Sequence, residues 1–262
     1  MELGIRGRVA MVAAGSKGLG RASALALAAE GCAVSICGRG AETLAQTRLA
    51  LEALGVPALA VTADVSSAAE LVRWHQATEA TLGAVDILIT NTGGPRAATF
   101  ANLADADWAE GVDSTLMNVV RLTRLVLPNM RARQWGRIVH ITSLVAKAPY
   151  PLLTISSTLR AGLSGLTRTL ALETAREGIT VNALLPGHVL TDRQFHLAEV
   201  KAAADGITVE QHFARQAAAI PMGRIGRPEE VGAVIAFLCG EPASYLTGQS
   251  LLVDGGLVQG TF

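Results

Sequence analysis

The stretch Val12-Ala13-Ala14-Gly15-Ser16-Lys17-Gly18-Leu19-Gly20 decides the fold class of this chain. It joins an apolar run, residues 8–13, to an Ala- and Leu-rich run, residues 18–30. Glycine lets a backbone turn tightly and approach a ligand, and the first turn of a helix offers unpaired N–H groups and a positive dipole end. The stretch therefore predicts a strand, a phosphate-binding turn and a helix. The candidate dinucleotide contacts are Gly15, Ser16, Lys17, Gly18, Leu19 and Gly20.

Short apolar runs alternate with longer helical runs on both sides of this turn. Strands are predicted at residues 8–13, 33–37, 58–62, 85–90, 137–142, 180–184 and 251–253, with helices at residues 18–30, 42–54 and 69–82. The strands are apolar on both faces, as in a parallel sheet that helices cover on both sides. We expect an α/β fold, a Rossmann-like doubly wound parallel sheet of about seven strands. Residues 1–262 are interpreted as a single domain, in which residues 191–220 interrupt the alternation and form a substrate lid.

Composition excludes several classes of partner. The 262 residues are 50% hydrophobic and 17% charged, and 22 Lys and Arg balance 22 Asp and Glu. This balance gives no bulk electrostatic reason to bind nucleic acid or a membrane. Cys32, Cys37 and Cys239 lack metal-ligand spacing, and we expect Cys32 and Cys37 to be buried free thiols and no metal to be bound. No apolar stretch approaches the length of a membrane span, so we expect a cytoplasmic protein.

The residues after the second predicted strand bear on the choice of dinucleotide. An acidic residue there would bind the ribose 2′-hydroxyl of NAD, whereas an Arg accommodates the 2′-phosphate of NADP. The chain has Gly38-Arg39 at this place, and Lys17 lies in the glycine turn. We expect Arg39 and Lys17 to converge on a 2′-phosphate, which predicts NADP(H) as the cofactor. The alternative is that both are solvated surface charges.

Further motifs along the whole chain resemble the short-chain dehydrogenase/reductase family. They are Ala63-Asp64-Val65, Asn91-Thr92-Gly93-Gly94, Gly136-Arg137-Ile138-Val139 leading to Ser143, Pro186-Gly187 followed by Thr191, Arg227-Pro228-Glu229-Glu230, Thr247-Gly248-Gln249 and Asp254-Gly255-Gly256. The resemblance implies an oxidoreductase similar to 3-oxoacyl-acyl-carrier-protein reductases. It implies a homodimer or homotetramer paired through long helices near residues 107–132 and 155–176. It also implies further cofactor contacts from Asp64, Val65, Asn91, Gly93, Arg160, Pro186, Gly187, Val189 and Thr191.

The chain departs from the family pattern in its glycine turn and at its catalytic positions. The first glycine of the family turn is Ala14 here, and we expect Gly15 to restore the conformational freedom. Ser143 keeps the family's Ser position. The family's Tyr and Lys positions hold Ser156 and Arg160, and its Asn position holds Thr115, with Asn118 one turn on.

These departures leave the source of the catalytic proton open. A phenol has a pKa of about 10, which a neighbouring ammonium brings toward working range, whereas a serine hydroxyl is a much weaker acid. Arg stays protonated, so Arg160 can steady an anion or hold the nicotinamide ribose but does not relay protons easily. We expect Ser143 to bind the substrate oxygen. The proton could come from Ser156 through water, from the loop residue Tyr150 or from His188, whose imidazole suits acid–base work.

Three functions compete on this pattern. The leading hypothesis is an NADP(H)-dependent oxidoreductase that transfers a hydride between nicotinamide and a small carbonyl or hydroxyl substrate. The second is a non-redox hydrolase, dehydratase or isomerase on the same fold. The third is a dinucleotide-binding sensor or inactive partner subunit. Fold alone does not choose among them.

Overall fold

Seven strands form one parallel sheet in the computed structural model, which describes residues 2–260. Their order across the sheet is β3-β2-β1-β4-β5-β6-β7. The strands are β1 (Val9–Val12), β2 (Ala33–Gly38), β3 (Ala58–Thr62), β4 (Ile87–Thr90), β5 (Gly136–Ile141), β6 (Ile179–Pro186) and β7 (Ser250–Val253). The order reverses between β1 and β4, where open α/β sheets bind ligands at the carboxyl ends of their strands. The predicted Rossmann-like fold is confirmed.

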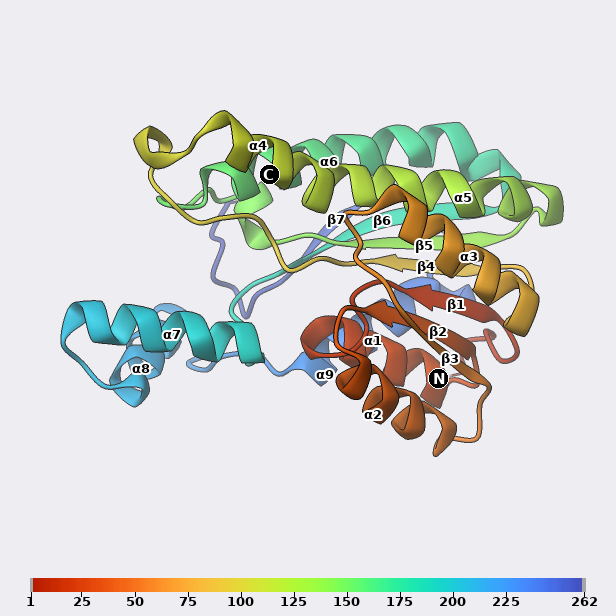
Figure 1. Ribbon diagram of the computed structural model, residues 1–262, viewed down its shortest axis with the longest axis horizontal. Coiled ribbons are helices and arrows are strands. Elements are labelled where there is room, and N and C mark those ends of the chain that lie inside the picture. Colours follow the sequence, from red (N-terminus) through yellow and green to blue (C-terminus); the bar gives the residue numbers. More distant parts are fainter. Residues whose placement is uncertain (1, 261–262) are drawn as a thin grey trace.

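Helices cover both faces of the sheet (Figure 1). One layer holds α1 (Gly18–Ala29), α2 (Ala41–Glu52) and α9 (Pro228–Cys239), and the other holds α3 (Ala68–Leu82), α4 (Asp105–Gly111), α5 (Asn118–Arg133) and α6 (Thr154–Thr174). Short helical segments are η1 (Phe100–Asn102), the π-helical η2 (Val112–Met117), η3 (Leu144–Ala146), η4 (Ala175–Glu177) and η5 (Glu241–Ala243). This two-sided cover explains why every residue of β1, β2, β4, β5 and β6 is buried.

Two further helices extend away from these layers as an arm (Figure 1). They are α7 (Asp192–Asp205) and α8 (Val209–Ala219), which occupy the segment predicted as a lid. Each begins at a threonine cap: Thr191 Oγ1 accepts a hydrogen bond from the Gln194 N–H, and Thr208 Oγ1 accepts one from the Gln211 N–H. The rings of Phe195 and Phe213 meet edge to face at 5.1 Å between centroids, which joins the two helices.

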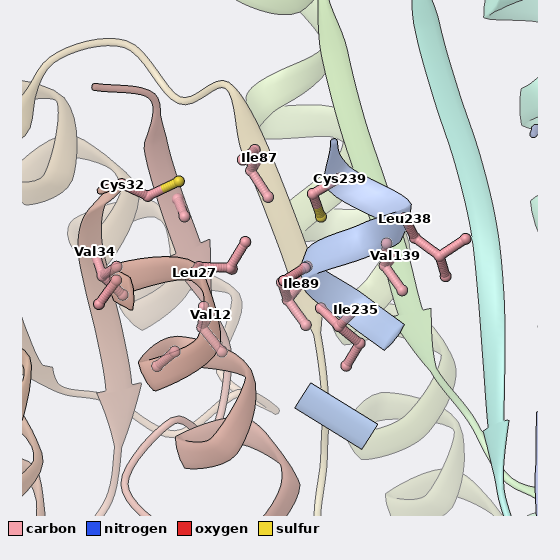
Figure 2. Packing of buried hydrophobic residues seen from close by; sticks show 14 of the residues in the cluster. Val12, Leu27, Cys32, Val34, Ile87, Ile89, Val139, Ile235, Leu238 and Cys239 are labelled. Carbon is pink, nitrogen blue, oxygen red and sulfur yellow. The ribbon is translucent and has the colours of Figure 1, made fainter. Parts of the chain in front are cut away.

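The apolar core fixes α1 and α9 against the sheet (Figure 2). Leu27 of α1 and Ile235 and Leu238 of α9 are fully buried, and each such side chain stabilises the fold by roughly 1.5–3 kcal/mol. Cys32 and Cys239 belong to the same cluster (Figure 2), and all three cysteines are buried free thiols. Burial raises the pKa of Cys32 and Cys37 to about 12, which keeps these thiols protonated and inert. The prediction for Cys32 and Cys37 is confirmed.

Element boundaries differ from the sequence predictions by a few residues. The strand predicted at residues 58–62 is found at those residues, whereas the helix predicted to reach residue 54 ends at Glu52. The chain turns there because Gly55 adopts φ +79° and its N–H donates to the Glu52 carbonyl at 2.9 Å. Within residues 2–260, none of the helices combines the length and apolar character that a membrane crossing requires.

Candidate active site

The glycine turn packs so closely that larger residues would not fit at two of its positions. A Cβ atom placed on Gly20 would lie 2.2 Å from the Ala14 carbonyl oxygen, and one on Gly15 would lie 2.7 Å from Ile36 Cγ2. The Gly15 N–H donates to the Cys37 carbonyl at 2.8 Å, which ties the turn to β2. No side chain caps the first N–H groups of α1, so these donors stay available to an anion. The geometry therefore fits the pyrophosphate of a dinucleotide.

Ala14, not Gly15, carries the unusual backbone conformation of this turn. Ala14 adopts φ +48°, in the left-handed region that residues with a Cβ atom enter at a cost. The φ angle of Gly15 is not positive. A glycine is needed at position 15 because a Cβ atom there would come too close to the Ile36 side chain. The expectation that Gly15 restores the lost freedom is therefore wrong in its mechanism. The turn forms with Ala14 itself in the left-handed conformation.

The two cations near the turn point to different places. Lys17 Nζ lies 3.3 Å from Asp192 Oδ2 on α7, so Lys17 bridges to the lid and does not converge with Arg39 in this structure. Arg39 is exposed directly after β2. A Cβ atom on Gly38 would lie 2.9 Å from Ser16 Oγ, which places the Ser16 hydroxyl beside the start of the Arg39 segment. The Ser16 hydroxyl is thus a second polar group beside the residue that precedes Arg39.

Two more motifs follow the ends of β3 and β4. Asp64 Oδ1 accepts hydrogen bonds from the Ser66 N–H at 2.9 Å and from Ser66 Oγ at 2.7 Å, and these bonds hold the pKa of Asp64 below its usual range. Val65, the next residue, is half-buried. Asn91 Nδ2 would lie 3.0 Å from a Cβ atom on Gly20, so the end of β4 meets the start of α1. Both motifs therefore lie at the carboxyl edge of the sheet.

The segment after β6 leads from the sheet to the glycine turn. Pro186 ends β6, and the Gly187 N–H donates to the Val253 carbonyl at 3.0 Å. Val189 is buried and pairs with Gly226 as an isolated β-bridge. Thr191 Cγ2 would lie 3.4 Å from a Cβ atom on Gly18, so this segment contacts the turn directly.

Ser156 and Arg160 form one unit on the buried side of α6. Arg160 Nε donates to Ser156 Oγ at 3.2 Å, as the spacing of four residues predicts. Arg160 Nη1 donates to the carbonyl oxygens of Thr142 at 2.6 Å and Ile141 at 3.4 Å. These bonds tie α6 to the carboxyl end of β5, where Ser143 follows within two residues. The structure therefore brings Ser143, Ser156 and Arg160 to one end of the sheet.

Both serine hydroxyls accept a hydrogen bond and keep a proton to donate. Ser156 Oγ accepts from Arg160, and Ser143 Oγ accepts from the Val145 N–H at 3.4 Å. A hydroxyl has one donor and two acceptor sites, so each can still donate to a ligand oxygen. Burial lowers the pKa of Arg160 to about 10, with the nearby Arg193 as a second cause, and the guanidinium remains charged at neutral pH.

Comparison with known proteins identifies the family. A family model described as enoyl-(acyl carrier protein) reductase matches residues 13–258. The chain belongs to the short-chain dehydrogenase/reductase family. It is 34% identical over 258 residues to 3-oxoacyl-[acyl-carrier-protein] reductase of Aquifex aeolicus, an alignment that covers 98% of this chain and 100% of that protein.

Two solved structures of the family superpose closely on this fold. L-sorbose reductase from Gluconobacter frateurii, complexed with NADPH and L-sorbose, is 32% identical, with a TM-score of 0.95 and coverage of 99% of this chain and 100% of that one. A variant of actinorhodin polyketide ketoreductase with NADPH is 38% identical, with a TM-score of 0.91 and coverage of 95% and 97%. The predicted class, a nicotinamide-dependent oxidoreductase that acts on carbonyl substrates, is confirmed at this level.

The other two candidate proton donors, Tyr150 and His188, form no hydrogen bond with Ser156 or Arg160 among residues 2–260. Tyr150 is 42% exposed and lines a cavity of about 390 Å³ with residues of the outer side of α6, whereas Ser156 and Arg160 lie on its buried side. Half-buried His188 lies near Lys201 and His212 of the lid helices. Its burial, followed by the charge of Lys201 and the presence of His212, lowers its pKa below the usual range.

The family's Asn position lies in the π-helical segment η2. Thr115 occupies it, and its buried Oγ1 has no hydrogen-bond partner within residues 2–260. Asn118 follows at the start of α5, where Nδ2 donates to the Ser114 carbonyl at 2.6 Å and Oδ1 is buried without a partner among the described residues. A π-helical turn is frequent at functional sites, and no pattern in the sequence signals it.

One charged residue near the site was missed by the sequence interpretation. Arg193 is the second residue of α7, and its guanidinium lies against the backbone of Gly93 and Gly94. No family motif includes position 193, and no spacing of residues in the sequence sets this Arg apart from the others. Within residues 2–260, no group of three or more His, Cys, Asp or Glu side chains is arranged to hold a metal.

Proposed function

We propose that this protein is an NADPH-dependent reductase of small carbonyl compounds. Ser143 keeps the family's Ser position, and Ser156 and Arg160 occupy its Tyr and Lys positions. The observation that supports this most is the hydrogen bond from Arg160 Nε to Ser156 Oγ, formed on a helix that is tied to the end of β5. These bonds join Ser156 and Arg160 to each other and to the residue that follows β5.

Three groups of residues would hold the cofactor. The turn from Gly15 to Gly20, with the free N–H groups of α1, would hold the pyrophosphate. Arg39 and Ser16 would hold the 2′-phosphate, which favours NADPH over NADH. Further contacts are proposed for Leu19, Asp64, Val65, Asn91, Gly93, Arg160, Pro186, Gly187, Val189 and Thr191. When bound, NADPH supplies a hydride to the carbonyl carbon.

The two serines would stabilise the negative charge that develops on the carbonyl oxygen. Ser143 and Ser156 each retain a donor proton, because their oxygens already accept bonds from Val145 and Arg160. The buried Arg160 cation stabilises negative charge beside Ser156, and fixed donors aimed at such an oxygen contribute about 10²–10³-fold each. Ser156 would pass its proton to the oxygen and recover it from water. Tyr150 and His188 remain alternative donors.

The lid helices would close over the substrate as one part of a single domain. Phe195 and Phe213 hold α7 to α8, so the arm would move as a unit. The Lys17–Asp192 ion pair at 3.3 Å links the start of α7 to the glycine turn. Binding at the turn would therefore couple to the position of the lid.

A homodimer paired through α5 and α6, or a homotetramer built from it, completes the proposal. A shallow groove of about 200 Å³ runs between these helices and is lined by Val120, Thr123, Arg124, Leu127, Leu166 and Leu170. Leu172, further along α6, is 75% exposed. A second copy would cover this apolar surface. Light scattering after size exclusion measures the mass, and Leu170→Glu should reduce it to that of a monomer.

The direct test of function is consumption of NADPH, followed by its absorbance, with a panel of ketones, keto acids and α-dicarbonyls. We expect steady oxidation of NADPH that is faster than oxidation of NADH at equal concentration, with the alcohol as product. Binding of NADPH without oxidation by any member of the panel would contradict the proposal and favour the sensor. Conversion of a substrate without NADPH would favour a non-redox enzyme. The expected cytoplasmic location stays a prediction.

A further inference from the structure

The turn that follows β3 presents one hydrogen-bond acceptor and one donor that the described chain does not use. Asp64 Oδ1 accepts two bonds from Ser66, whereas Asp64 Oδ2 accepts none within residues 2–260. The next N–H group, that of Val65, donates to no acceptor among the same residues. Adenine carries an amino donor beside a ring-nitrogen acceptor, so its edge complements a carboxylate oxygen beside an N–H group. The contacts proposed for Asp64 and Val65 therefore have the chemistry that adenine requires.

Arg121 of α5 holds this turn from 55 residues further along the chain. Its Nη1 donates to the Ser66 carbonyl at 2.9 Å, and the N–H and hydroxyl of Ser66 in turn hold Asp64 Oδ1. Glu70, from the adjacent helix α3, accepts a bond from the Asp64 N–H at 2.8 Å. The Asp64 carboxylate is therefore fixed from two sides, and Arg121 is the tie that comes from outside the segment between β3 and α3.

The π-helical segment η2 orients the Arg121 guanidinium. Arg121 Nη2 donates to Asp113 Oδ1 at 2.7 Å, and Asp113 lies in η2, eight residues earlier. In a regular α-helix, residues eight apart differ in direction by about 80°, whereas residues seven apart differ by about 20°. Because a π-helical turn accommodates one extra residue, it brings Asp113 and Arg121 to one side of the helix. Two bonds thus hold the Arg121 side chain, which is only 24% exposed.

We propose that Arg121 is a positioning residue for the base of the cofactor. By holding Ser66, it aims Asp64 Oδ2 and the neighbouring N–H group at the amino group and ring nitrogen of adenine. This rests on the proposed function, because it concerns the same dinucleotide. Hypoxanthine carries a carbonyl oxygen where adenine has its amino group, so the ionised Asp64 would face an acceptor in place of a donor. A site built in this way rejects that base.

The test compares two dinucleotides that differ only in the base. NADPH and reduced nicotinamide hypoxanthine dinucleotide phosphate are each titrated by fluorescence, and the ratio of their affinities measures the base preference. The variants are Arg121→Gln and Arg121→Lys, and the control is Arg131→Gln. Arg131 lies near the other end of α5, and its variant loses a comparable ion pair, with Glu177 at 2.8 Å. Melting temperatures check that each protein is folded.

We expect the wild type to prefer NADPH over the hypoxanthine analogue by about tenfold or more, because the analogue lacks a hydrogen bond to a charged group. Arg121→Gln should reduce this preference to less than about threefold through weaker binding of NADPH, while its affinity for the analogue stays within about twofold of the wild type. Arg121→Lys can still donate to the Ser66 carbonyl and should retain a preference of at least about fivefold. Arg131→Gln should behave as the wild type.

An unchanged preference in Arg121→Gln would overturn the proposal, as would equal losses of affinity for both dinucleotides or the absence of a preference in the wild type. Failure of the wild type to bind either dinucleotide would overturn it together with the proposed function. Because binding needs no hydride transfer, a protein that shows the preference but oxidises no NADPH would refute the reductase activity and leave the role of Arg121 in place.

Discussion

Replacement of Arg39 by alanine tests how the protein selects its cofactor. Arg39 follows β2 directly and is exposed, and Ser16 Oγ lies against Gly38 beside it. A 2′-phosphate bound there would lose its cationic partner in the variant. NADH has no 2′-phosphate, so its affinity should not change.

The expected magnitude follows from the exposure of the site. Two unit charges 4 Å apart interact by about 1 kcal/mol in water and about 4 kcal/mol near a protein surface. Because Arg39 is exposed, the lower half of this range applies, about 1–2.5 kcal/mol, and NADPH affinity should fall about 5- to 70-fold. Added salt should reduce the difference in NADPH affinity between the wild type and the Arg39→Ala variant, because salt screens exposed charges.

Fluorescence titration with NADPH and NADH measures both affinities, and two variants serve as controls. Lys17→Ala should change NADPH affinity by less than about threefold, because Lys17 pairs with Asp192 and not with the Arg39 segment. Arg48→Ala removes an exposed charge that pairs with Glu52 within α2 and should have no effect. If Lys17→Ala weakened NADPH as much as Arg39→Ala, the two cations would converge after all and the interpretation of the turn would be refuted.

Three further changes test the turn and the core. Gly20→Ala forces a methyl group to 2.2 Å from the Ala14 carbonyl, so it should lower stability by about 1–3 kcal/mol and weaken NADPH binding; unchanged melting and affinity would contradict the packing described. Ala14→Gly relieves a left-handed φ of +48° but adds freedom to the unfolded chain, so the melting temperature should stay constant or rise by up to about 4 °C, whereas Ala13→Gly should lower it. Burial lowers the pKa of His140 to about 4, so the unfolded chain takes up this proton first and stability should fall as pH drops from about 6.5 to about 4. Urea unfolding at pH 7 and pH 5 checks this, and His140→Asn should show a smaller fall than the wild type.

Much of the fold could be predicted because its signals are local. The strand at residues 58–62 and the helix that starts at Gly18 depend on apolar runs and on glycines within a few positions. The contact between Ser156 and Arg160 was predictable for the same reason, since residues four apart share one side of a helix.

The features that sequence could not supply depend on residues far apart in the chain. The Lys17 side chain points toward Asp192, which belongs to the lid. The residues near the turn give no sign of this distant partner. Arg193 reaches Gly94 only because α7 returns to the end of β4. The left-handed conformation of Ala14 was also unforeseen. Glycine adopts a positive φ at a lower energetic cost than alanine, so the neighbouring Gly15 was expected to adopt it.

The most direct test of the proposed chemistry is the turnover of Ser143→Ala, with NADPH and the best carbonyl substrate of the panel. Ser143 follows β5, and its hydroxyl accepts from Val145 while keeping a proton for the substrate oxygen. We predict a fall in kcat/KM of about 10²–10³-fold with NADPH affinity unchanged. Undiminished turnover in that variant would show that the carbonyl oxygen is stabilised elsewhere and would contradict the assignment of Ser143.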